Sequence, residues 1–495
     1  MTKMRKLSGG ISSDAIMLLI VKLVTTALGL IITRLLSEYL TVYDYGTYSQ
    51  ILLVVSTVSS VTVLGMMDGI NYFYCREQDQ QRRESYVATV FALQSTLGTA
   101  AGCVVMALST PLCLYFENPD IKALLIFAAA LPVLQNLMGM FQILLVSVGR
   151  AGLLAVRNLV VSLLRLAVVL VVVTVAREVW IILLATVLLD VGQITVFWAI
   201  LRRHNCHIRL TKVKWSLLGE ILRYCAPMAV FTVINALNRD LDKYVISLWM
   251  DTETLAMYAN ASKPLPFDIL MTSFCTVLIP HITRLIAVGD KKQAAALYKV
   301  FLEIAYMSTA VLCCAALAAS PQLMKLLYSN KYTDGLRIFC IYILVDLMRF
   351  TNITLVLSAA GKTRQLMAVG IGSLVLNGVL NVALYHTIGI LGPAIATLLA
   401  TIVAGVLMLY FSAEELGTKL YKLFDGKYLW LFLLESVFLT TALIALRHML
   451  ELWDVHYFLT LIMIAGLYGI VMILLNGKRL FNALRNVNQH APNAQ

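Results

Sequence analysis

The sequence predicts an all-α, polytopic membrane protein of about fourteen transmembrane helices, and three observations support this. First, 60% of its 495 residues are hydrophobic and only 13% are charged, whereas soluble domains average about a quarter charged. Second, the mean hydropathy is +0.83. Third, apolar runs of about 20 residues, long enough to span a bilayer, recur along the whole chain.

The expected spans follow one another with short connections, which leaves no length for a soluble catalytic domain. The first run follows a short basic segment and is too long for a signal-peptide core, so we expect a retained transmembrane helix. The expected runs lie near residues 14–36, 47–70, 86–110, 121–147, 152–176, 179–201, 224–250, 254–284, 297–320, 335–358, 366–388, 390–411, 428–447 and 455–475.

A weak internal repeat, offset by about 210 residues, divides these spans into two halves. Arg34 followed by Tyr45-Gly46-Thr47-Tyr48 corresponds to Lys243 followed by Ala256-Met257-Tyr258. Repeats of this kind are common in transporters, with the substrate site between the halves. We therefore expect two pseudo-symmetric six-helix bundles, at 1–213 and 214–413, and two additional helices with a short cytoplasmic tail at 414–495.

Loop charges predict the orientation and explain most of the formal net charge of +12. With both termini in the cytoplasm, most of the 39 Lys and Arg residues fall in cytoplasmic loops, as the positive-inside rule requires. Nucleic-acid binding is therefore not needed to explain the basic excess. The nine cysteines are scattered and form no CxxC motif, so we expect neither a metal site nor a cofactor. The compact trio His204, Cys206 and His207 lies among arginines and reads as a basic loop.

Charges inside the apolar runs are the candidate functional residues, because each costs about 2.5–3.5 kcal/mol at a helix centre. Most are cationic, which favours an anionic substrate. The candidates for substrate binding are Lys22, Arg157, Arg165, Arg239, Lys243, Lys263 and Arg349, and the candidates for ion coupling are Asp240, Asp242, Asp268 and Asp346.

The run 224–250 carries the densest polar pattern. Asn235, Asn238, Arg239 and Asp242 share one helix face. Arg239 with Asp242, and Asp240 with Lys243, have the i, i+3 spacing of helical ion pairs. The pattern predicts either the wall of a water-filled cavity or a self-neutralised interface between helices.

The run 152–176 places Asn158, Ser162 and Arg165 on one stripe, with Arg157 beside it. Arg165 has no acidic neighbour within its own run, so we expect it to bind an anionic ligand or a carboxylate from another helix, Asp190 or Asp346. Arginine suits phosphate oxygens because its planar fork makes two parallel hydrogen bonds.

Three further positions have simpler alternatives. Asp346 and Arg349 are spaced to pair within one helix. Lys22 lies close enough to the start of its helix to extend toward the cytoplasm. Lys263-Pro264-Leu265-Pro266 should kink or break its helix, because proline removes a backbone donor. The kink is either tolerated or marks a site or hinge.

Expected enzyme signatures are missing. The sequence has no Walker loop, no HExxH and no GxSxG, and no catalytic residue is assigned. We expect a transporter and not an enzyme.

At these positions the sequence resembles the polysaccharide-biosynthesis flippases of the multidrug/oligosaccharidyl-lipid/polysaccharide (MOP) exporter superfamily, which include the O-antigen and capsule translocases. The resemblance covers nearly the whole chain in order. It rests on Thr33-Arg34-Leu35-Leu36, Tyr45–Tyr48 and Leu64-Gly65-Met66 through Tyr72, on Ala226-Pro227 through Asp242-Lys243, Tyr258, Ala261-Ser262-Lys263 and Pro280, and on Ala359-Ala360-Gly361-Lys362 with Gly389–Thr397.

The resemblance implies two bundles around a central cationic cavity that opens alternately to each side. The implied substrate is a polyprenyl-pyrophosphate-linked oligosaccharide, moved from the cytoplasmic to the outer leaflet of a bacterial inner membrane for O-antigen, capsule or exopolysaccharide assembly. Asp242 and Lys263 are the firmest positions carried over from the family pattern. The double proline after Lys263 departs from that pattern.

Alternatives within the superfamily are a lipid II flippase and a cation-coupled multidrug antiporter. The implied partners are membrane lipid, H⁺ or Na⁺ as coupling ion, and a polysaccharide polymerase with its chain-length protein. We expect Arg165→Ala and Arg239→Ala to abolish glycan export.

Overall fold

A computed structural model describes residues 8–77, 79–148, 151–203, 208–269, 271, 278, 282–286 and 288–490. All regular secondary structure in these residues is helical. Twelve helices are long and apolar enough to cross a membrane, and a bent pair, Trp215–Ala226 with Met228–Trp249, brings the number to thirteen. Thirteen of the fourteen expected runs fall on these spans. The eighth, 254–284, begins as a helix and continues into positions outside the described residues.

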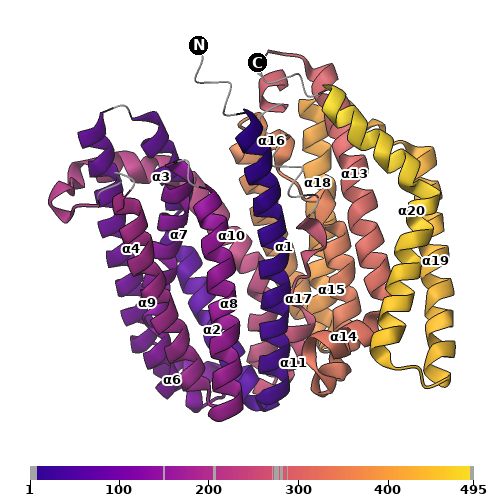
Figure 1. The fold of residues 1–495 in the computed structure, drawn as a ribbon, viewed down its shortest axis with the longest axis horizontal. Helices are drawn as coiled ribbons and strands as arrows, with labels where there is room; N and C mark the ends of the chain where they lie inside the picture. The colour runs from indigo at the N-terminus through magenta and orange to yellow at the C-terminus, as the bar shows by residue number, and fades with distance from the viewer. Residues whose placement is uncertain are drawn as a thin grey trace. The chain divides into compact units, whose positions relative to one another are not determined.

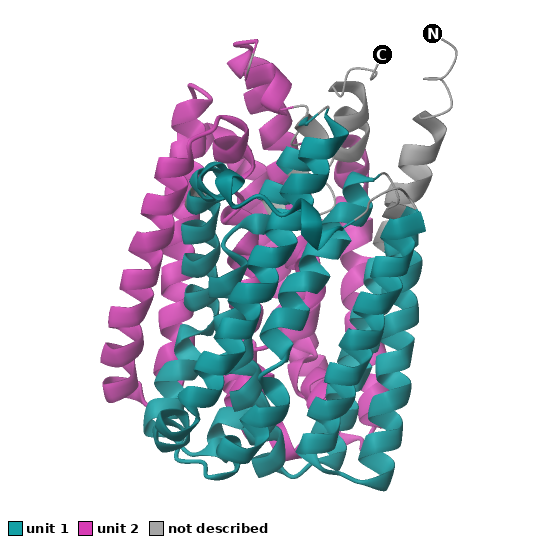
Figure 2. Ribbon diagram, turned by 90° about the vertical axis from the view of Figure 1, so that its left-hand side faces the viewer, with its two compact units in different colours: residues 1–257 teal, residues 258–495 magenta. Residues whose placement is uncertain are grey.

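The chain forms two compact units, residues 1–257 and 258–495 (Figure 2). The predicted boundaries at 213/214 and 413/414 divide the chain by its internal repeat, whereas the two units are defined by compactness. The predicted boundaries therefore stay a prediction. The helix that follows residue 213 packs with helices of the first unit.

The first unit consists of helices joined by short turns. In Figure 1 its α4, α7 and α9 run side by side, and α1 runs along α8. The helices are α1 (Ser8–Tyr39), α2 (Val42–Val63), α3 (Met66–Arg76), α4 (Gln80–Ala107), α5 (Ser109–Tyr115), α6 (Asp120–Ala128), α7 (Leu131–Ser147), α8 (Ala151–Val175), α9 (Val179–Arg203), α10 (Leu218–Trp249) and most of α11 (Thr252–Ala261), with 3₁₀ turns η2 (Leu210–Lys212) and η3 (Trp215–Leu217).

Small residues bring the backbones of this unit close together. On α4, Gly98 and Gly102 form a GxxxG pair, the spacing that lets membrane helices approach closely. A Cβ added at Gly98 would lie 2.5 Å from the Cα of Val133, and one at Gly102 would lie 2.2 Å from the carbonyl oxygen of Ala129. Glycine is therefore required where α4 crosses the start of α7.

The second span ends earlier than the predicted run 47–70. Leu64 and Gly65 both have left-handed backbone conformations, with φ of 48° and 64°, and this ends α2 at Val63. A Cβ at Gly65 would come within 2.8 Å of the backbone nitrogen of Ala229 on α10. The break therefore lies where α10 passes. The segments of α10 on either side of residue 227 meet at 51°, and the proline there lacks the N–H that an unbroken helix would need.

The second unit is built in the same way. In Figure 1 its last two helices run side by side, and α20 also packs along α13. Its elements are η4 (Pro266–Asp268), α13 (Lys291–Ala318), α14 (Ser320–Tyr328), η5 (Asn330–Gly335), α15 (Leu336–Met348), η6 (Arg349–Thr351), α16 (Leu355–Ala359), α17 (Thr363–Ile388), α18 (Leu391–Glu415), η7 (Leu420–Leu423), α19 (Gly426–Leu452) and α20 (Tyr457–His490).

The double proline interrupts the helix as predicted. Helix α11 ends at Ala261, the backbone through Leu265 is not helical, and a single 3₁₀ turn follows. The carboxylate of Asp346 on α15 accepts a hydrogen bond of 3.0 Å from the backbone N–H of Leu265. A buried side chain thus satisfies a backbone donor that the broken helix leaves without an intrahelical partner.

Large apolar side chains are exposed along the outward faces of several long helices. Val175 is 81% exposed on α8, Phe438 75% on α19 and Leu474 78% on α20. In water such surface would be costly, and in a bilayer it is the surface that faces lipid. Together with the apolar spans, this describes a multi-pass membrane protein.

Candidate functional site

A cavity of about 560 Å³ lies within the first unit, among five of its helices. Polar side chains from α7, α8 and α9 form most of its wall, and α1 and α2 contribute the rest. The lining residues are Thr25, Tyr48, Leu52, Leu131, Gln135, Met138, Gly139, Gln142, Arg157, Asn158, Val161, Ser162, Arg165, Thr186, Asp190 and Gln193. Two of the predicted cationic candidates, Arg157 and Arg165, are therefore part of one cavity.

Arg165 is paired across two helices. Its Nη2 donates to Oδ1 of Asp190 on α9 at 2.7 Å. The Asp190 side chain is 5% exposed, whereas that of Arg165 is 44% exposed. Of the two partners that the sequence left open, the structure thus shows Asp190. The guanidinium stays accessible while its partner lies behind it.

Arg157 is held by neutral groups. Its Nη1 donates to Asn158 Oδ1 at 2.8 Å, and its Nη2 donates to Gln193 Oε1 and contacts Met138 Sδ at 3.2 Å. The guanidinium carbon lies 4.6 Å from the ring centre of Phe197, a cation–π contact. No carboxylate pairs with Arg157 among the described residues, so its charge is not neutralised by direct contact.

Gln193 links the two arginines. Besides accepting from Arg157, it donates from Nε2 to Asp190 Oδ1 at 2.9 Å. Asp190 and Gln193 are three residues apart on α9, so they lie on one face of the helix. The result is a continuous hydrogen-bonded chain from Arg157 through Gln193 and Asp190 to Arg165.

Lys22 lies on α1, one turn before the cavity residue Thr25. Its side chain is exposed, and its carbonyl accepts from the hydroxyls of Thr25 and Thr26. Lys22 itself is not part of the cavity wall.

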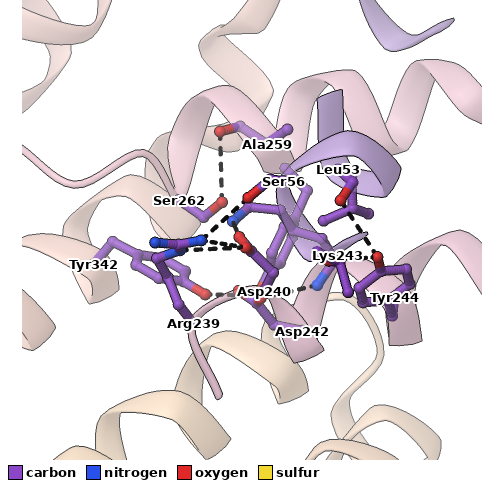
Figure 3. A network of polar contacts seen from close by, with 12 residues as sticks. Leu53, Ser56, Arg239, Asp240, Asp242, Lys243, Tyr244, Ala259, Ser262 and Tyr342 are labelled. Carbon is purple, nitrogen blue, oxygen red and sulfur yellow. Dashed lines mark hydrogen bonds and ion pairs between the residues drawn. The ribbon is translucent and has the colours of Figure 1, made fainter. Parts of the chain in front are cut away.

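The charges of α10 form a second cluster in this unit, drawn in Figure 3. Asp240 accepts from Arg239 at 3.0 Å and from Lys243 at 2.7 Å. The predicted pairing of Lys243 with Asp240 is confirmed. The expected pairing of Arg239 with Asp242 is wrong, because the guanidinium turns to its neighbour Asp240 and to the hydroxyl of Ser56 on α2, at 3.2 Å.

Other residues fix this part of α10 to its neighbours. Tyr244 donates to Thr57 Oγ1 on α2 at 2.7 Å, and Tyr115 donates to the carbonyl of Tyr244 at 2.6 Å. Asp242 is buried, at 1% exposed, and its Oδ1 accepts from the backbone N–H of Lys243 at 2.9 Å.

The remaining candidates lie in the second unit. Arg349 pairs with Asp346 at 3.0 Å, within one turn as the spacing predicts. The Asp346 side chain is 4% exposed. Lys263 is exposed in the non-helical segment after α11, and Asp268 is half-buried in the turn η4. The cavity of the first unit therefore contains two of the predicted candidates, Arg157 and Arg165.

No group of three or more His, Cys, Asp and Glu side chains that could hold a metal occurs in the part of the chain that the structure describes. The trio at 204, 206 and 207 lies outside the described residues.

The sequence matches a known protein family over more than half of its length. Residues 31–337 match the model of the polysaccharide biosynthesis proteins. The chain belongs to this family. No curated protein sequence matches this polysaccharide biosynthesis protein significantly.

Solved structures share the all-α, polytopic fold. A lipid II flippase, MurJ in an inward closed conformation, aligns with a TM-score of 0.73 at 16% identity, over 94% of this chain and 100% of its own. An inward-facing MATE multidrug transporter of the MOP superfamily aligns with 0.68 at 14%, over 81% and 98%. A mutant of the Vibrio cholerae MATE transporter VcmN aligns with 0.54 at 14%, over 85% and 100%. The all-α polytopic fold and the resemblance to the polysaccharide biosynthesis proteins are confirmed.

Several cavity residues of this polysaccharide biosynthesis protein were not among the sequence candidates. Gln135, Gly139 and Gln142 follow one another at i, i+4, i+7 on α7. Gln193 lies on α9 at i+3 from Asp190, which the sequence had offered only as a possible partner of Arg165. Amide and acidic side chains at helical spacing within an apolar run are the signal that identifies such a wall.

Proposed function

We propose that this protein is an alternating-access flippase that moves a polyprenyl-pyrophosphate-linked oligosaccharide from the cytoplasmic to the outer leaflet. The supporting observation is the cavity of the first unit, which contains two arginines and one carboxylate. A pyrophosphate-linked glycan cannot cross hydrocarbon unaided, because its charges and hydroxyls would lose their water. A polar cavity with accessible guanidinium groups replaces that water.

The balance of charge in the cavity favours an anionic substrate. Arg157 and Arg165 face a single carboxylate, Asp190, which leaves one positive charge uncompensated by contact. A cationic drug would encounter that charge as repulsion, so a multidrug antiporter is the weaker alternative. A lipid II flippase has the same requirement for a pyrophosphate, and it is the second candidate because the lipid II flippase MurJ aligns over 94% of the chain. The family match favours a surface polysaccharide.

The remainder of the wall suits the sugar part. Gln135, Gln142 and Asn158 offer amides and Ser162 and Thr186 offer hydroxyls to the same cavity. Neutral groups that both donate and accept hydrogen bonds are the chemical complement of sugar hydroxyls. In this proposal the arginines bind the pyrophosphate and the amides contact the glycan.

Location and coupling complete the proposal. In this proposal the protein lies in a bacterial inner membrane with both termini in the cytoplasm, the orientation that the basic loops favour. A polysaccharide polymerase and its chain-length protein are the proposed functional partners. A gradient of H⁺ or Na⁺ supplies direction, with Asp240, Asp242, Asp268 and Asp346 as candidate coupling groups. Lys22, Lys263 and Arg349 are proposed to contact the substrate at other steps of its path. Arg239 and Lys243 are proposed to make a weaker substrate contact beside their structural role on α10.

The test replaces Arg157 in a bacterial strain that depends on this protein for its surface glycan. Arg157→Gln keeps a polar side chain and removes the charge. We expect glycan export to fall about ten-fold and the lipid-linked oligosaccharide to accumulate. The measurement is surface polysaccharide by immunoblot together with extracted lipid-linked glycan.

The matched control is Arg203→Gln, at the exposed end of α9, which should export normally. Equal membrane levels of both variants exclude a folding defect. Normal export by Arg157→Gln would refute the proposed cavity. Accumulation of peptidoglycan precursor in place of the lipid-linked glycan would select the lipid II alternative.

A further inference from the structure

Asp190 is the single acidic side chain of the cavity wall, and its placement differs from that of a simple structural counter-ion. It lies beneath Arg165, almost fully buried, and the arginine stays accessible. Among the described residues, the Arg165 side chain makes one hydrogen bond, from Nη2 to Asp190. Arginine has five N–H donors in a rigid fork, so most of the donors of Arg165 remain for an incoming anion.

A carboxylate in this position lowers the affinity of the cavity for anions. An anion that binds Arg165 approaches a charge that already pairs with Asp190, and the two negative groups repel each other across the guanidinium. Removing the carboxylate would leave two arginines, separated by two helical turns on α8, facing one cavity. Such a pair would hold a pyrophosphate tightly in whichever conformation bound it.

A transporter gains nothing from tight binding in one state, because its substrate must also leave. A ligand shifts a conformational equilibrium only by its difference in affinity between the states, and very tight binding to one state traps the protein there. We propose that Asp190 is a release carboxylate: it competes with the substrate's anionic group for Arg165 and thereby keeps binding weak enough for turnover. This inference rests on the proposed flippase function.

Gln193 extends the competition to the second arginine. Its Nε2 donates to the Asp190 oxygen that also accepts from Arg165, and its Oε1 accepts from Arg157. An anion that draws Arg165 away leaves Asp190 with Gln193 as a hydrogen-bond partner. The carboxylate therefore does not become an unsatisfied buried group, which would be costly. Asp190 acts through Arg165 and is a positioning residue.

The test measures affinity and turnover separately in purified protein. Asp190→Asn is isosteric, and its Oδ1 still accepts both hydrogen bonds. With farnesyl pyrophosphate as the binding probe, we expect about ten-fold tighter binding than in the wild type. In proteoliposomes loaded with a fluorescent polyprenyl-pyrophosphate glycan, we expect KM and kcat both to fall about ten-fold. Loss of a merely structural contact would not tighten binding. Unchanged or weaker binding by Asp190→Asn would overturn the inference.

Two further variants complete the experiment. Asp190→Asn combined with Arg165→Gln should bind as weakly as Arg165→Gln alone, because the carboxylate acts through that arginine. Asn158→Asp adds a carboxylate where Arg157 already donates, at 2.8 Å, and should weaken binding about ten-fold. The Asn158→Asp variant tests the same idea if Asp190→Asn does not fold. Unchanged affinity of Asn158→Asp for farnesyl pyrophosphate would also overturn the inference.

The two levels of the hypothesis fail differently. If the wild-type protein neither binds farnesyl pyrophosphate nor flips the glycan, the proposed function is wrong. If the wild type does both and Arg165→Gln does so equally well, the flippase proposal stands, and the role of Arg165 and the release carboxylate are rejected. If Arg165→Gln loses both activities while Asp190→Asn shows no tighter binding, the flippase proposal stands and only the release carboxylate is rejected.

Discussion

The two charged clusters of the first unit differ in how their charges are paired. On α10, Arg239 and Lys243 both pair with Asp240 within a single turn of one helix. In the cavity, Arg165 of α8 reaches Asp190 of α9. The distance within a pair on one helix does not change when that helix moves relative to its neighbours. A pair between helices depends on their separation, so it can respond both to a ligand and to movement of the wall.

Arg165 and Arg239 are residues of the same type in different surroundings. Both Arg165 and Arg239 are about half exposed, with side chains 44% and 52% accessible. Only Arg165 lines the cavity of the first unit. We therefore expect the cavity cluster to control transport and the α10 cluster mainly to stabilise the helix in its apolar surroundings.

The largest effect is expected from Arg165→Ala. The substitution removes a cavity charge and leaves the carboxylate of Asp190 without its ionic partner. Truncating one member of such a pair costs about 2 kcal/mol or more, which corresponds to about 30-fold. We expect glycan export to fall by at least that factor, measured as initial rates in proteoliposomes.

Arg165→Lys is the informative control for this variant. It keeps the charge and loses the planar fork, so export should be reduced and not lost. If Arg165→Ala retained more than a third of wild-type export at equal protein levels, the two clusters would not differ as proposed.

The second effect concerns stability. Asp240 is the shared acceptor of its cluster, and its side chain is 10% exposed. Asp240→Ala leaves Lys243, 16% exposed, without its carboxylate in an apolar region. Breaking a buried ion pair by removing one partner is strongly destabilising, and with partial exposure we expect about 2 kcal/mol, seen as a lower melting temperature in detergent.

Asp240→Asn keeps the shape and the acceptor oxygen, so its loss of stability should be smaller than that of Asp240→Ala. An Asp240→Ala protein as stable as the wild type would show that the α10 cluster is not structural. The charges of α10 would then be assigned to substrate binding, as the sequence alone suggests.

The difference between the clusters also marks what the sequence can predict. Spacing along one helix predicted the pairs of Lys243 with Asp240 and of Arg349 with Asp346, because side chains three residues apart lie on the same face and can meet. The stripe Asn158, Ser162 and Arg165 lines one cavity for the same reason. The apolar runs predicted the spans, because every spanning backbone must form its own hydrogen bonds.

Contacts between helices were beyond the sequence pattern. Arg165 had two possible acidic partners, and only the packing of α8 with α9 selects Asp190. The choice of Asp240 over Asp242 by Arg239 follows from the side-chain path toward Ser56 on α2. The end of α2 at Val63 depends on the left-handed conformation of Leu64, which is unusual for a leucine and has no sequence signal.

The smallest effect is expected from Arg239→Ala. The guanidinium is 52% exposed, and Asp240 keeps its bond to Lys243 after the substitution. Exposed ion pairs contribute about 0–1 kcal/mol, so stability should change by less than about 1 kcal/mol. Glycan export should fall no more than about three-fold, in place of the complete loss that the sequence alone suggested. The measurement pairs melting in detergent with export in proteoliposomes. If Arg239→Ala abolished export as completely as Arg165→Ala, the α10 cluster would belong to the transport path, and pairing within one helix would no longer distinguish structural from functional charges in this protein.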